Sequence, residues 1–136
     1  MPIAYKTNIP LDLDAVIEVY KASTLGERRP VDDRPRIQRM IDNADLIITA
    51  WDGDLMVGIA RSVTDWAYCC YLSDLAVRES HQRQGIGKEL IRRTRVEIGE
   101  QTALILLAAP KAVDYYGHIG MKQHPSAWVL RPGDKI

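Results

Sequence analysis

A chain of 136 residues, of which 46% are hydrophobic, is long enough for one compact domain with its own core and too short for two, so we expect residues 1–136 to form a single domain. Lys and Arg together number 18, as do Asp and Glu, so the formal net charge is zero. This argues against an overall positive potential that would attract nucleic acid or an anionic membrane. The N-terminus lacks the apolar core of a signal peptide, and no apolar run approaches the roughly 18 residues that span a bilayer. A cytoplasmic protein is therefore expected.

The two cysteines, Cys69 and Cys70, follow each other within an apolar run. Neighbouring side chains of a strand point to opposite faces, so a disulfide between the two is not expected. The chain has no third cysteine and only three scattered histidines, too few ligands at suitable spacing for a tetrahedral zinc site. We therefore predict no metal.

The N-terminal part of the chain predicts one strand and two helices. Ile3 to Thr7 is typical of an edge strand. Asp12 to Ser23 carries apolar residues at helical spacing and predicts an amphipathic helix. The stretch from Leu25 to Pro35 is a charged loop interrupted by prolines, and Pro35 opens a second helix that runs to about Asn43.

Three long strands are expected next. Asp45 to Trp51 and Leu55 to Thr64 are joined across an Asp-Gly pair, which is a strong hairpin signal. Trp66 to Val77 predicts the third strand. Its middle, Tyr68 to Leu72, is apolar on both faces, as expected of a central strand that is covered on both sides.

The third strand ends at a glycine turn that contains Gly85 and Gly87, where the absence of a Cβ lets the backbone approach a ligand. A helix is predicted from Gln84 or Gly85 to near Gly99. The amides that open this helix are unpaired and suit phosphate oxygens. The inward face of the helix is expected to carry Ile86, Leu90, Ile91 and Thr94.

The C-terminal part predicts a strand, a short helix and a closing strand. These elements are Thr102 to Ala109, Lys111 to Tyr116 and Gln123 to Leu130. A helical crossover makes the third long strand and Thr102–Ala109 parallel neighbours. The order of elements predicts an α/β fold with a mixed, mostly antiparallel sheet and helices on both faces.

Two motifs connect the chain to a known family. The pattern Gln82-x-x-Gly85-x-Gly87 lacks the third glycine of the dinucleotide fingerprint G-x-G-x-x-G, and the region contains no G-x-x-x-x-G-K-[ST] sequence of a P-loop. It resembles the Q/R-x-x-G-x-G/A signature of the GNAT family of N-acetyltransferases, and it follows a strand, as in that family.

The second motif lies about thirty residues downstream. Ala112 to Met121 resembles the family's late pattern A-x-x-F-Y-x-x-x-G-F, with Tyr116 at the position of the tyrosine and Met121 in place of the last Phe. The order and spacing of both motifs, each among the expected elements, identify the chain as a small single-domain member of the GNAT family.

The resemblance implies transfer of an acyl group, usually acetyl, from acetyl-CoA to a primary amine of a small molecule or protein within a ternary complex. In the family fold the two parallel strands splay apart at their C-terminal ends, which leaves a wedge for the pantetheine arm. That arm would pair with the backbone of the strand end formed by Leu75, Ala76 and Val77, mainly through Leu75 and Val77. The pyrophosphate would lie on the turn formed by Gln82, Arg83, Gln84, Gly85, Ile86, Gly87 and Lys88.

The resemblance also suggests catalytic residues. Tyr116 is the candidate general acid for the departing thiolate, because a tyrosine with a pKa near 10 can donate a proton at neutral pH. Its neighbour Tyr115 is expected to face elsewhere, in the core. The only carboxylate in the matching part of the third strand is Asp74, which is either a general base or a structural hydrogen-bond partner. Deprotonation of the amine through water is the default.

Two further positions bear on the site. Simple alternation places Asp74 on the same face as Leu72 and Ala76. The Asn that many relatives carry near the end of the next strand is absent, and Ala109 stands in its place. This replacement, together with the two alternative roles of Asp74, leaves open a non-catalytic acyl-CoA-binding or sensor module. An interaction domain with an incidental glycine turn would require both motifs to be coincidences.

The acceptor is not specified by the sequence. The loop from Glu27 to Arg34 carries both signs of charge, so it either contacts an acceptor or forms internal ion pairs on the surface. Four aromatic residues either line an acceptor pocket or belong to the core: Trp66, Tyr68, Tyr71 and Trp128. The expected partner is a small-molecule or peptide amine, with neither nucleic acid nor membrane. An uncovered closing strand would also offer an edge for a homodimer.

Overall fold

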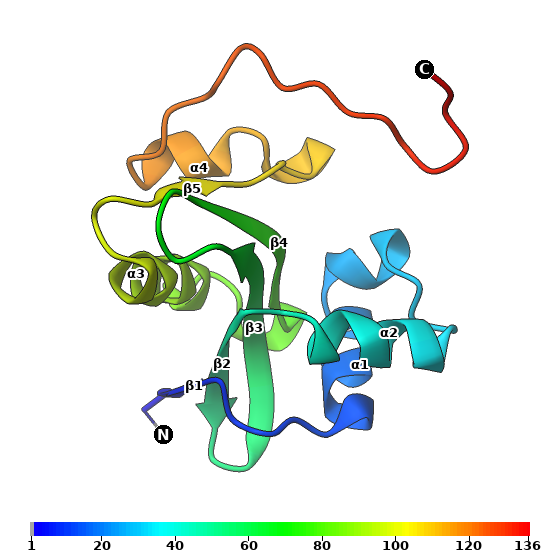
Figure 1. Ribbon diagram of the computed structural model, residues 1–136. Helices are drawn as coiled ribbons and strands as arrows, with labels where there is room; N and C mark the ends of the chain where they lie inside the picture. The colour runs from blue at the N-terminus through cyan, green and yellow to red at the C-terminus, as the bar shows by residue number, and fades with distance from the viewer. Residues whose placement is uncertain (1) are drawn as a thin grey trace.

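The computed structural model describes residues 2–136 and contains one mixed sheet with the strand order β1-β2-β3-β4-β5 (Figure 1). All neighbouring strands are antiparallel except β4 and β5, which are parallel. The expected mixed, mostly antiparallel sheet is therefore confirmed. The strands are β1 (Ala4–Thr7), β2 (Leu46–Asp52), β3 (Leu55–Thr64), β4 (Cys69–Val77) and β5 (Ala103–Ile105).

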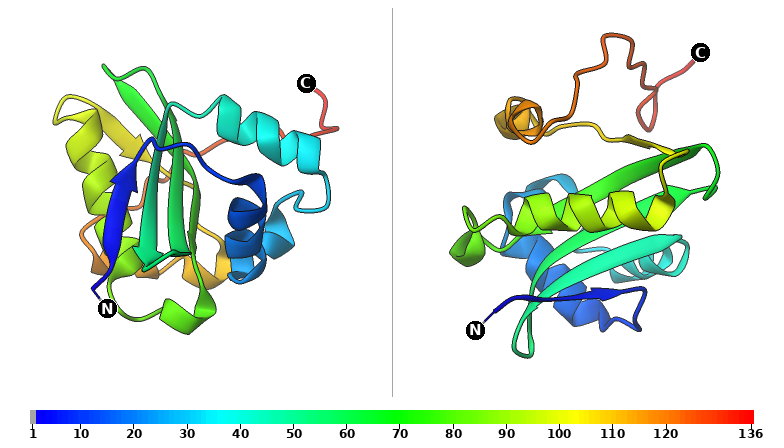
Figure 2. Two further views of the ribbon diagram at one scale, coloured as in Figure 1. Left: turned by 90° about the horizontal axis from the view of Figure 1, so that it is seen from below. Right: turned by 90° about the vertical axis from the view of Figure 1, so that its left-hand side faces the viewer.

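Helices cover both faces of the sheet. On one face lie α1 and α2, and on the other lie α3 and the short α4 (Figure 2). The helices are α1 (Leu13–Lys21), α2 (Arg34–Asp42), α3 (Ile86–Ile98) and α4 (Tyr115–His118). Short 3-10 helices lie in three of the connections: η1 (Thr24–Arg28) between α1 and α2, η2 (Glu79–His81) between β4 and α3, and η3 (Pro110–Ala112) between β5 and α4. In residues 2–136, no helix is long and apolar enough to cross a membrane.

Local signals account for the helix positions. Asp12 caps α1 by accepting a hydrogen bond from the Ala15 amide, and Asp33 caps α2 in the same way. The inward face of α3 is buried as expected, and Ile98 extends it by one turn. At Gly58 in β3, a Cβ would lie 3.1 Å from the Leu90 side chain, so the glycine lets α3 pack closely on the sheet.

A β-bulge at Ser73 changes the pattern expected for β4. Arg61 pairs with Asp74, whereas Ser62 pairs with Leu72, so Ser73 has no opposite residue in β3. The extra residue inverts the alternation. Leu72 packs on the α3 side, while Asp74 and Ala76 face the α1 side, so the prediction that Leu72 shares their face is wrong.

The C-terminal part departs most from the prediction. Strand pairing in β5 covers only Ala103–Ile105, because the rest of Thr102–Ala109 leaves the edge of β4. The helix expected over Lys111–Tyr116 is divided into η3 and α4. The predicted closing strand Gln123–Leu130 is wrong: this segment has no regular structure and its side chains are exposed.

A physical reason for the missing strand lies in its composition. The β-prone run from Trp128 to Leu130 is only three residues long, and Pro125 and Pro132 flank it, neither of which can donate a backbone hydrogen bond. After α4 the chain instead runs over the edge of the sheet toward the side of α1 and α2 (Figure 1). The two cysteines are both free thiols, with Cys69 exposed and Cys70 buried, as the alternation of a strand predicts.

Candidate active site

The glycine turn is built at the end of β4. After Val77 the chain forms η2 and then turns into α3, whose N-cap residue Gly85 adopts the left-handed conformation with φ of 81°. The N-cap makes no side-chain hydrogen bond to the first turn of α3. The amides of this turn are therefore open to an anion, and the helix dipole adds partial positive charge there.

The predicted turn residues differ in what they present. Gln82 is tied to the end of β4, because its Nε2 donates a hydrogen bond to the Val77 carbonyl at 3.0 Å. Ile86 is buried against the core, so only its backbone is available to a ligand. The other side chains of the turn, those of Arg83, Gln84 and Lys88, are exposed. Gly87 leaves room at the start of α3, where a Cβ would lie 3.9 Å from Val77 and 3.5 Å from the Tyr115 hydroxyl.

The two parallel strands separate just before this turn. Pairing between β4 and β5 covers Cys69 to Tyr71 and stops at the pair of Tyr71 with Ile105. On the edge of β4 that faces away from β3, the stretch from Leu72 to Val77 has no strand partner within the part of the chain that the structure describes. The N–H and C=O groups on that edge, including the segment Leu75, Ala76 and Val77, can therefore pair with an extended ligand.

Tyr116 is half-buried and packs against the core cluster that contains α3. Burial, followed by the neighbouring Tyr115, raises the pKa of Tyr116. Among residues 2–136, no hydrogen bond to its hydroxyl is found. The phenol is thus protonated at neutral pH and has its donor free.

Tyr115 lies in a different place from the one expected. It does not face the core: 38% of the residue is exposed, and its hydroxyl approaches Gly87 at the start of α3. The rings of Tyr115 and Tyr116 meet edge to face, with centroids 5.2 Å apart. This packing directs one tyrosine toward the core and the other toward the glycine turn.

Asp74 is fully buried and accepts hydrogen bonds from two other elements, α1 and β3, and from the loop after η1. The donors are the Tyr20 hydroxyl of α1 at 2.6 Å, Arg29 Nε at 2.6 Å and Arg61 Nε of β3 at 2.5 Å. The Ser73 hydroxyl adds a longer contact at 3.3 Å. These donors occupy both carboxylate oxygens.

The electrostatics of this cluster favour an ionised Asp74. Burial alone would raise the pKa of Asp74, but the hydrogen bond and charge of Arg61, with help from Tyr20 and Arg29, hold the pKa below its usual value. Burial, followed by the charge of Asp74, raises the pKa of Tyr20, so that hydroxyl keeps its proton. A carboxylate with a low pKa and occupied oxygens is a poor proton acceptor, which favours the structural alternative for Asp74.

Sequence reasoning missed the partners of Asp74. Arg29 belongs to the charged loop, and there it forms an internal ion pair, as does Arg34 with Asp14 of α1. Arg61 is the one charged residue of the mostly apolar strand β3, and a lone arginine in such a strand is the signal that could have identified a buried acidic partner. The distance along the chain between these residues hid the pairing.

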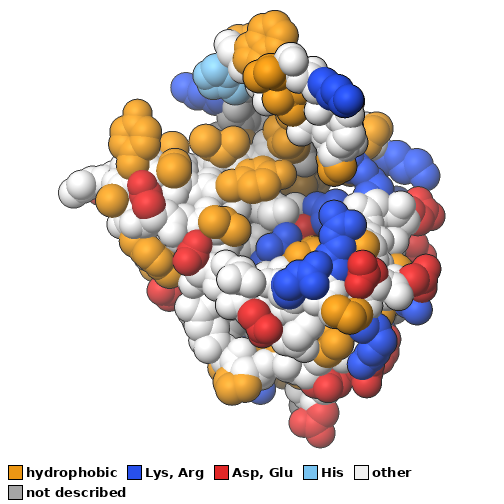
Figure 3. Space-filling model, turned by 45° about the vertical axis from the view of Figure 1, so that its right-hand side comes forward, with side chains coloured by type: hydrophobic (Ala, Val, Ile, Leu, Met, Phe, Trp, Pro, Cys, Tyr) orange, Lys and Arg blue, Asp and Glu red, His pale blue; other side chains and the backbone are white. Residues whose placement is uncertain are grey.

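An apolar row crosses the same face of the sheet as α1 and α2, over the part that these helices do not cover. Val63 of β3 pairs with Tyr71 of β4, which pairs with Ile105 of β5, and these three residues are 48%, 40% and 52% exposed. The four aromatic residues considered for a pocket are all exposed, so none belongs to the core. Apolar and basic side chains border the space beneath the C-terminal segment (Figure 3).

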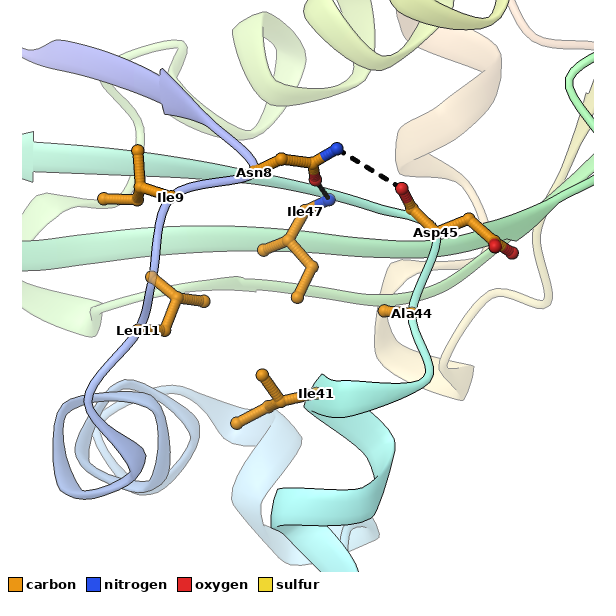
Figure 4. Close-up of a pocket in the computed structure, with 7 residues that line it drawn as sticks. All are labelled: Asn8, Ile9, Leu11, Ile41, Ala44, Asp45 and Ile47. Atoms are coloured by element: carbon orange, nitrogen blue, oxygen red, sulfur yellow. Dashed lines mark hydrogen bonds between the residues drawn. The ribbon is translucent and has the colours of Figure 1, made fainter.

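A separate hollow of about 210 Å³ lies between the segment that precedes α1 and the connection from α2 to β2 (Figure 4). Its polar lining is already paired: Asn8 accepts from the Ile47 amide at 2.7 Å and donates to the Asp45 carbonyl at 3.3 Å. None of its lining residues comes from β4, α3 or α4. We therefore assign it no part in the site.

The free edge of β4 and the open amides at the start of α3 suit an extended ligand that ends in phosphates. A family model described as the acetyltransferase (GNAT) family matches residues 13–121. The chain belongs to this family, and its chemistry is acyl transfer from an acyl-CoA.

Individual proteins support this assignment. An uncharacterized N-acetyltransferase, ycf52, of Gracilaria tenuistipitata var. liui is 24% identical, over 87% of this chain and 69% of the relative. The GNAT family acetyltransferase SP0256 of Streptococcus pneumoniae superposes with a TM-score of 0.73 and 26% identity, over 96% of this chain and 99% of that chain. The aminoglycoside N-acetyltransferase AAC(6')-Iy, in a complex with CoA, shares the fold with a TM-score of 0.72 at 16% identity, over 96% of this chain and 94% of that chain.

Replacement of Asp74 by Asn should destabilise the fold, because Arg29 and Arg61 would lose their buried counter-charge. Breaking a buried ion pair costs about 3–5 kcal/mol of unfolding free energy. The folded pKa of Asp74 is lowered, so its contribution is fully present above the unfolded pKa of about 3.9 and is lost as the pH falls through the folded value. Urea unfolding between pH 3 and pH 7 should show a steeper loss of stability in acid for the wild type than for Asp74→Asn. Equal slopes would contradict the ionised cluster.

Proposed function

We propose that this protein is an N-acetyltransferase that transfers the acetyl group of acetyl-CoA to a primary amine of a small molecule or peptide, by direct attack within a ternary complex. One observation carries the proposal: β4 has an unpaired edge, and the next helix along the chain, α3, begins at an N-cap glycine that makes no side-chain hydrogen bond to the first turn. An extended arm that ends in phosphates matches both parts of this path.

The residues along the path fit the parts of the cofactor. The pantetheine arm would pair with the backbone of Leu75 and Val77, next to Ala76. The pyrophosphate would lie on the amides of the turn from Gln82 to Lys88, and the cationic side chains of Arg83 and Lys88 stand beside it. Bound there, acetyl-CoA supplies a thioester carbonyl that a nucleophile can attack.

The residues of the chain then act on that carbonyl. A backbone amide of β4 near the Ser73 bulge polarises its oxygen and stabilises the negative charge that develops there. The amine nitrogen forms a bond with the carbonyl carbon while the bond from carbon to sulfur breaks. Tyr116 donates its proton to the departing thiolate. The nitrogen loses its second proton as the amide forms, and this proton restores the Tyr116 phenol.

The amine must lose a proton before it attacks. Asp74 is poorly suited to accept this proton, since its oxygens are occupied by buried donors. Instead, a water molecule at the solvent-exposed face of the sheet, beside the row of Val63, Tyr71 and Ile105, accepts the proton. The acceptor lies over the apolar row of Val63, Tyr71 and Ile105, where its amine reaches β4. Related folds that include aminoglycoside acetyltransferases support a small-molecule acceptor.

A second candidate function is a non-catalytic acyl-CoA-binding module. Two features favour it: the oxygens of Asp74 are occupied, so Asp74 is not free to act as a general base, and Ala109 stands where many relatives carry an Asn that contacts cofactor or substrate. The free hydroxyl of Tyr116 favours the enzyme. Release of CoA thiol in the presence of amines decides between the two.

Gly87→Glu should abolish binding of acetyl-CoA, because it places bulk and negative charge where the pyrophosphate would lie. Calorimetric titration measures this, and a loss of affinity of at least 100-fold is expected. Gly87→Ala is the matched control: its Cβ meets only ordinary contacts, 3.5 Å from Tyr115 and 3.9 Å from Val77. Saturable binding by a folded Gly87→Glu variant would remove the cofactor from this turn.

Tyr116→Phe should lower kcat by about 100-fold and leave the Kd for CoA within about threefold, because only the proton donor is lost. Tyr5→Phe on the edge strand serves as a control for the loss of a hydroxyl. Because the pKa of Tyr116 is raised, its proton is retained through neutral pH, and the wild-type kcat should fall from loss of this proton only above about pH 10. An unchanged kcat in the Phe variant would remove the acid role from Tyr116.

A further inference from the structure

Two arginines hold the bulge of β4 from behind. Arg29 Nη2 donates to the Ser73 carbonyl at 2.7 Å, and Arg61 Nη2 donates to the Ser73 hydroxyl at 3.1 Å. The same arginines donate through Nε to Asp74, the next residue. The extra residue of the bulge is therefore fixed by both its backbone and its side chain.

The planar guanidinium explains how Arg29 makes these contacts. Its Nε and Nη2 donate to Asp74 and to the Ser73 carbonyl, and its Nη1 donates to the Arg28 carbonyl at 2.8 Å. A fork of rigid donors sets the spacing between the carboxylate and the carbonyl that it joins. A lysine carries the same charge as a single point and cannot impose that spacing.

The bulge occupies a critical position along β4. It begins two residues after Tyr71, where pairing with β5 ends, and it precedes the segment from Leu75 to Val77 that the pantetheine arm would pair with. A bulge bends its strand and re-aims the groups around it. The orientation of the amides from Ser73 to Leu75 therefore depends on the clamp formed by Arg29, Arg61 and Asp74.

The clamp also has a net positive charge. Two guanidinium groups and one carboxylate leave one unbalanced charge behind the strand, and Arg61 and Asp74 are buried there. A fixed positive charge in a poorly solvated region stabilises negative charge that develops nearby. Both the aim of the amides and the charge behind them thus favour an anionic carbonyl oxygen at the bulge.

We propose that Arg29, anchored by Asp74, is a positioning residue that locks the Ser73 bulge and so aims a β4 amide at the acyl carbonyl. This inference rests on the proposed function. It gives the charged loop from Glu27 to Arg34 a role that differs from direct contact with an acceptor, because the Arg29 guanidinium donates its hydrogen bonds to Ser73 and Asp74 of β4. Arg29 comes from the loop after η1 and is 21% exposed, so its replacement leaves the buried pair of Arg61 and Asp74 in place.

The experiment uses acetyl-CoA labelled with ¹³C at the acetyl carbonyl as the probe, so that no acceptor is needed. A hydrogen bond from the bulge amide should displace the carbonyl resonance of the bound probe from its position in free acetyl-CoA. In Arg29→Gln this displacement should fall by at least half, while the Kd for acetyl-CoA stays within about threefold. Arg92→Gln, which breaks the exposed pair with Glu89 on α3, should keep the full displacement.

Two further variants separate positioning from folding. Arg29→Lys retains the charge without the fork, so it should remain folded and still lose most of the displacement. Arg29→Ala with added guanidinium ions at millimolar concentration should recover it, because the site opens to solvent. Once an amine acceptor has been found, kcat should fall by about 10- to 100-fold in Arg29→Gln with little change in the KM for acetyl-CoA.

The possible results point in different directions. A full displacement in both Arg29→Gln and Arg29→Lys, with wild-type Kd, would overturn the positioning role and leave the proposed function standing. Failure of the wild-type protein to bind acetyl-CoA would instead overturn the proposed function, and the positioning role with it. Reduced displacement with retained binding supports the role of Arg29.

Discussion

The buried carboxylate of Asp74 is the interaction on which the site depends. It joins Tyr20 of α1, Arg29 after η1 and Arg61 of β3 to one point of β4. An ionised carboxylate without these donors would be too costly to bury, so the elements that carry them must meet there. The same contacts fix the Ser73 bulge, which links the packing of the α1 side to the geometry of β4, the strand proposed to bind the cofactor.

The separation of β4 and β5 leaves a free strand edge with which an extended ligand can pair. The two strands pair over three positions only, and β4 continues to Val77 with one edge free. The free edge leads to the turn at Gly85, where the first amides of α3 are open. A fold with a longer β5 would satisfy that edge with protein hydrogen bonds and leave none for a cofactor.

Local signals in the sequence were sufficient for some of these features and insufficient for others. Gly85 and Gly99 bound α3 because left-handed and cap conformations favour glycine, and such preferences act within a few residues. The Ser73 bulge depends on arginines far away in the chain, so alternation along β4 alone placed Leu72 on the wrong face. The closing strand from Gln123 to Leu130 failed for a similar reason, since a strand needs a partner as well as β-prone residues.

Hydrogen exchange of the amides from Leu72 to Val77 tests the proposal that the free edge of β4 binds the cofactor. Saturating CoA should slow exchange at alternate amides of this stretch and at Gly87, because these groups gain partners. The amides of β1, at the other edge of the sheet, should be unchanged. Saturable CoA binding without added protection along β4 would place the cofactor elsewhere on the molecule.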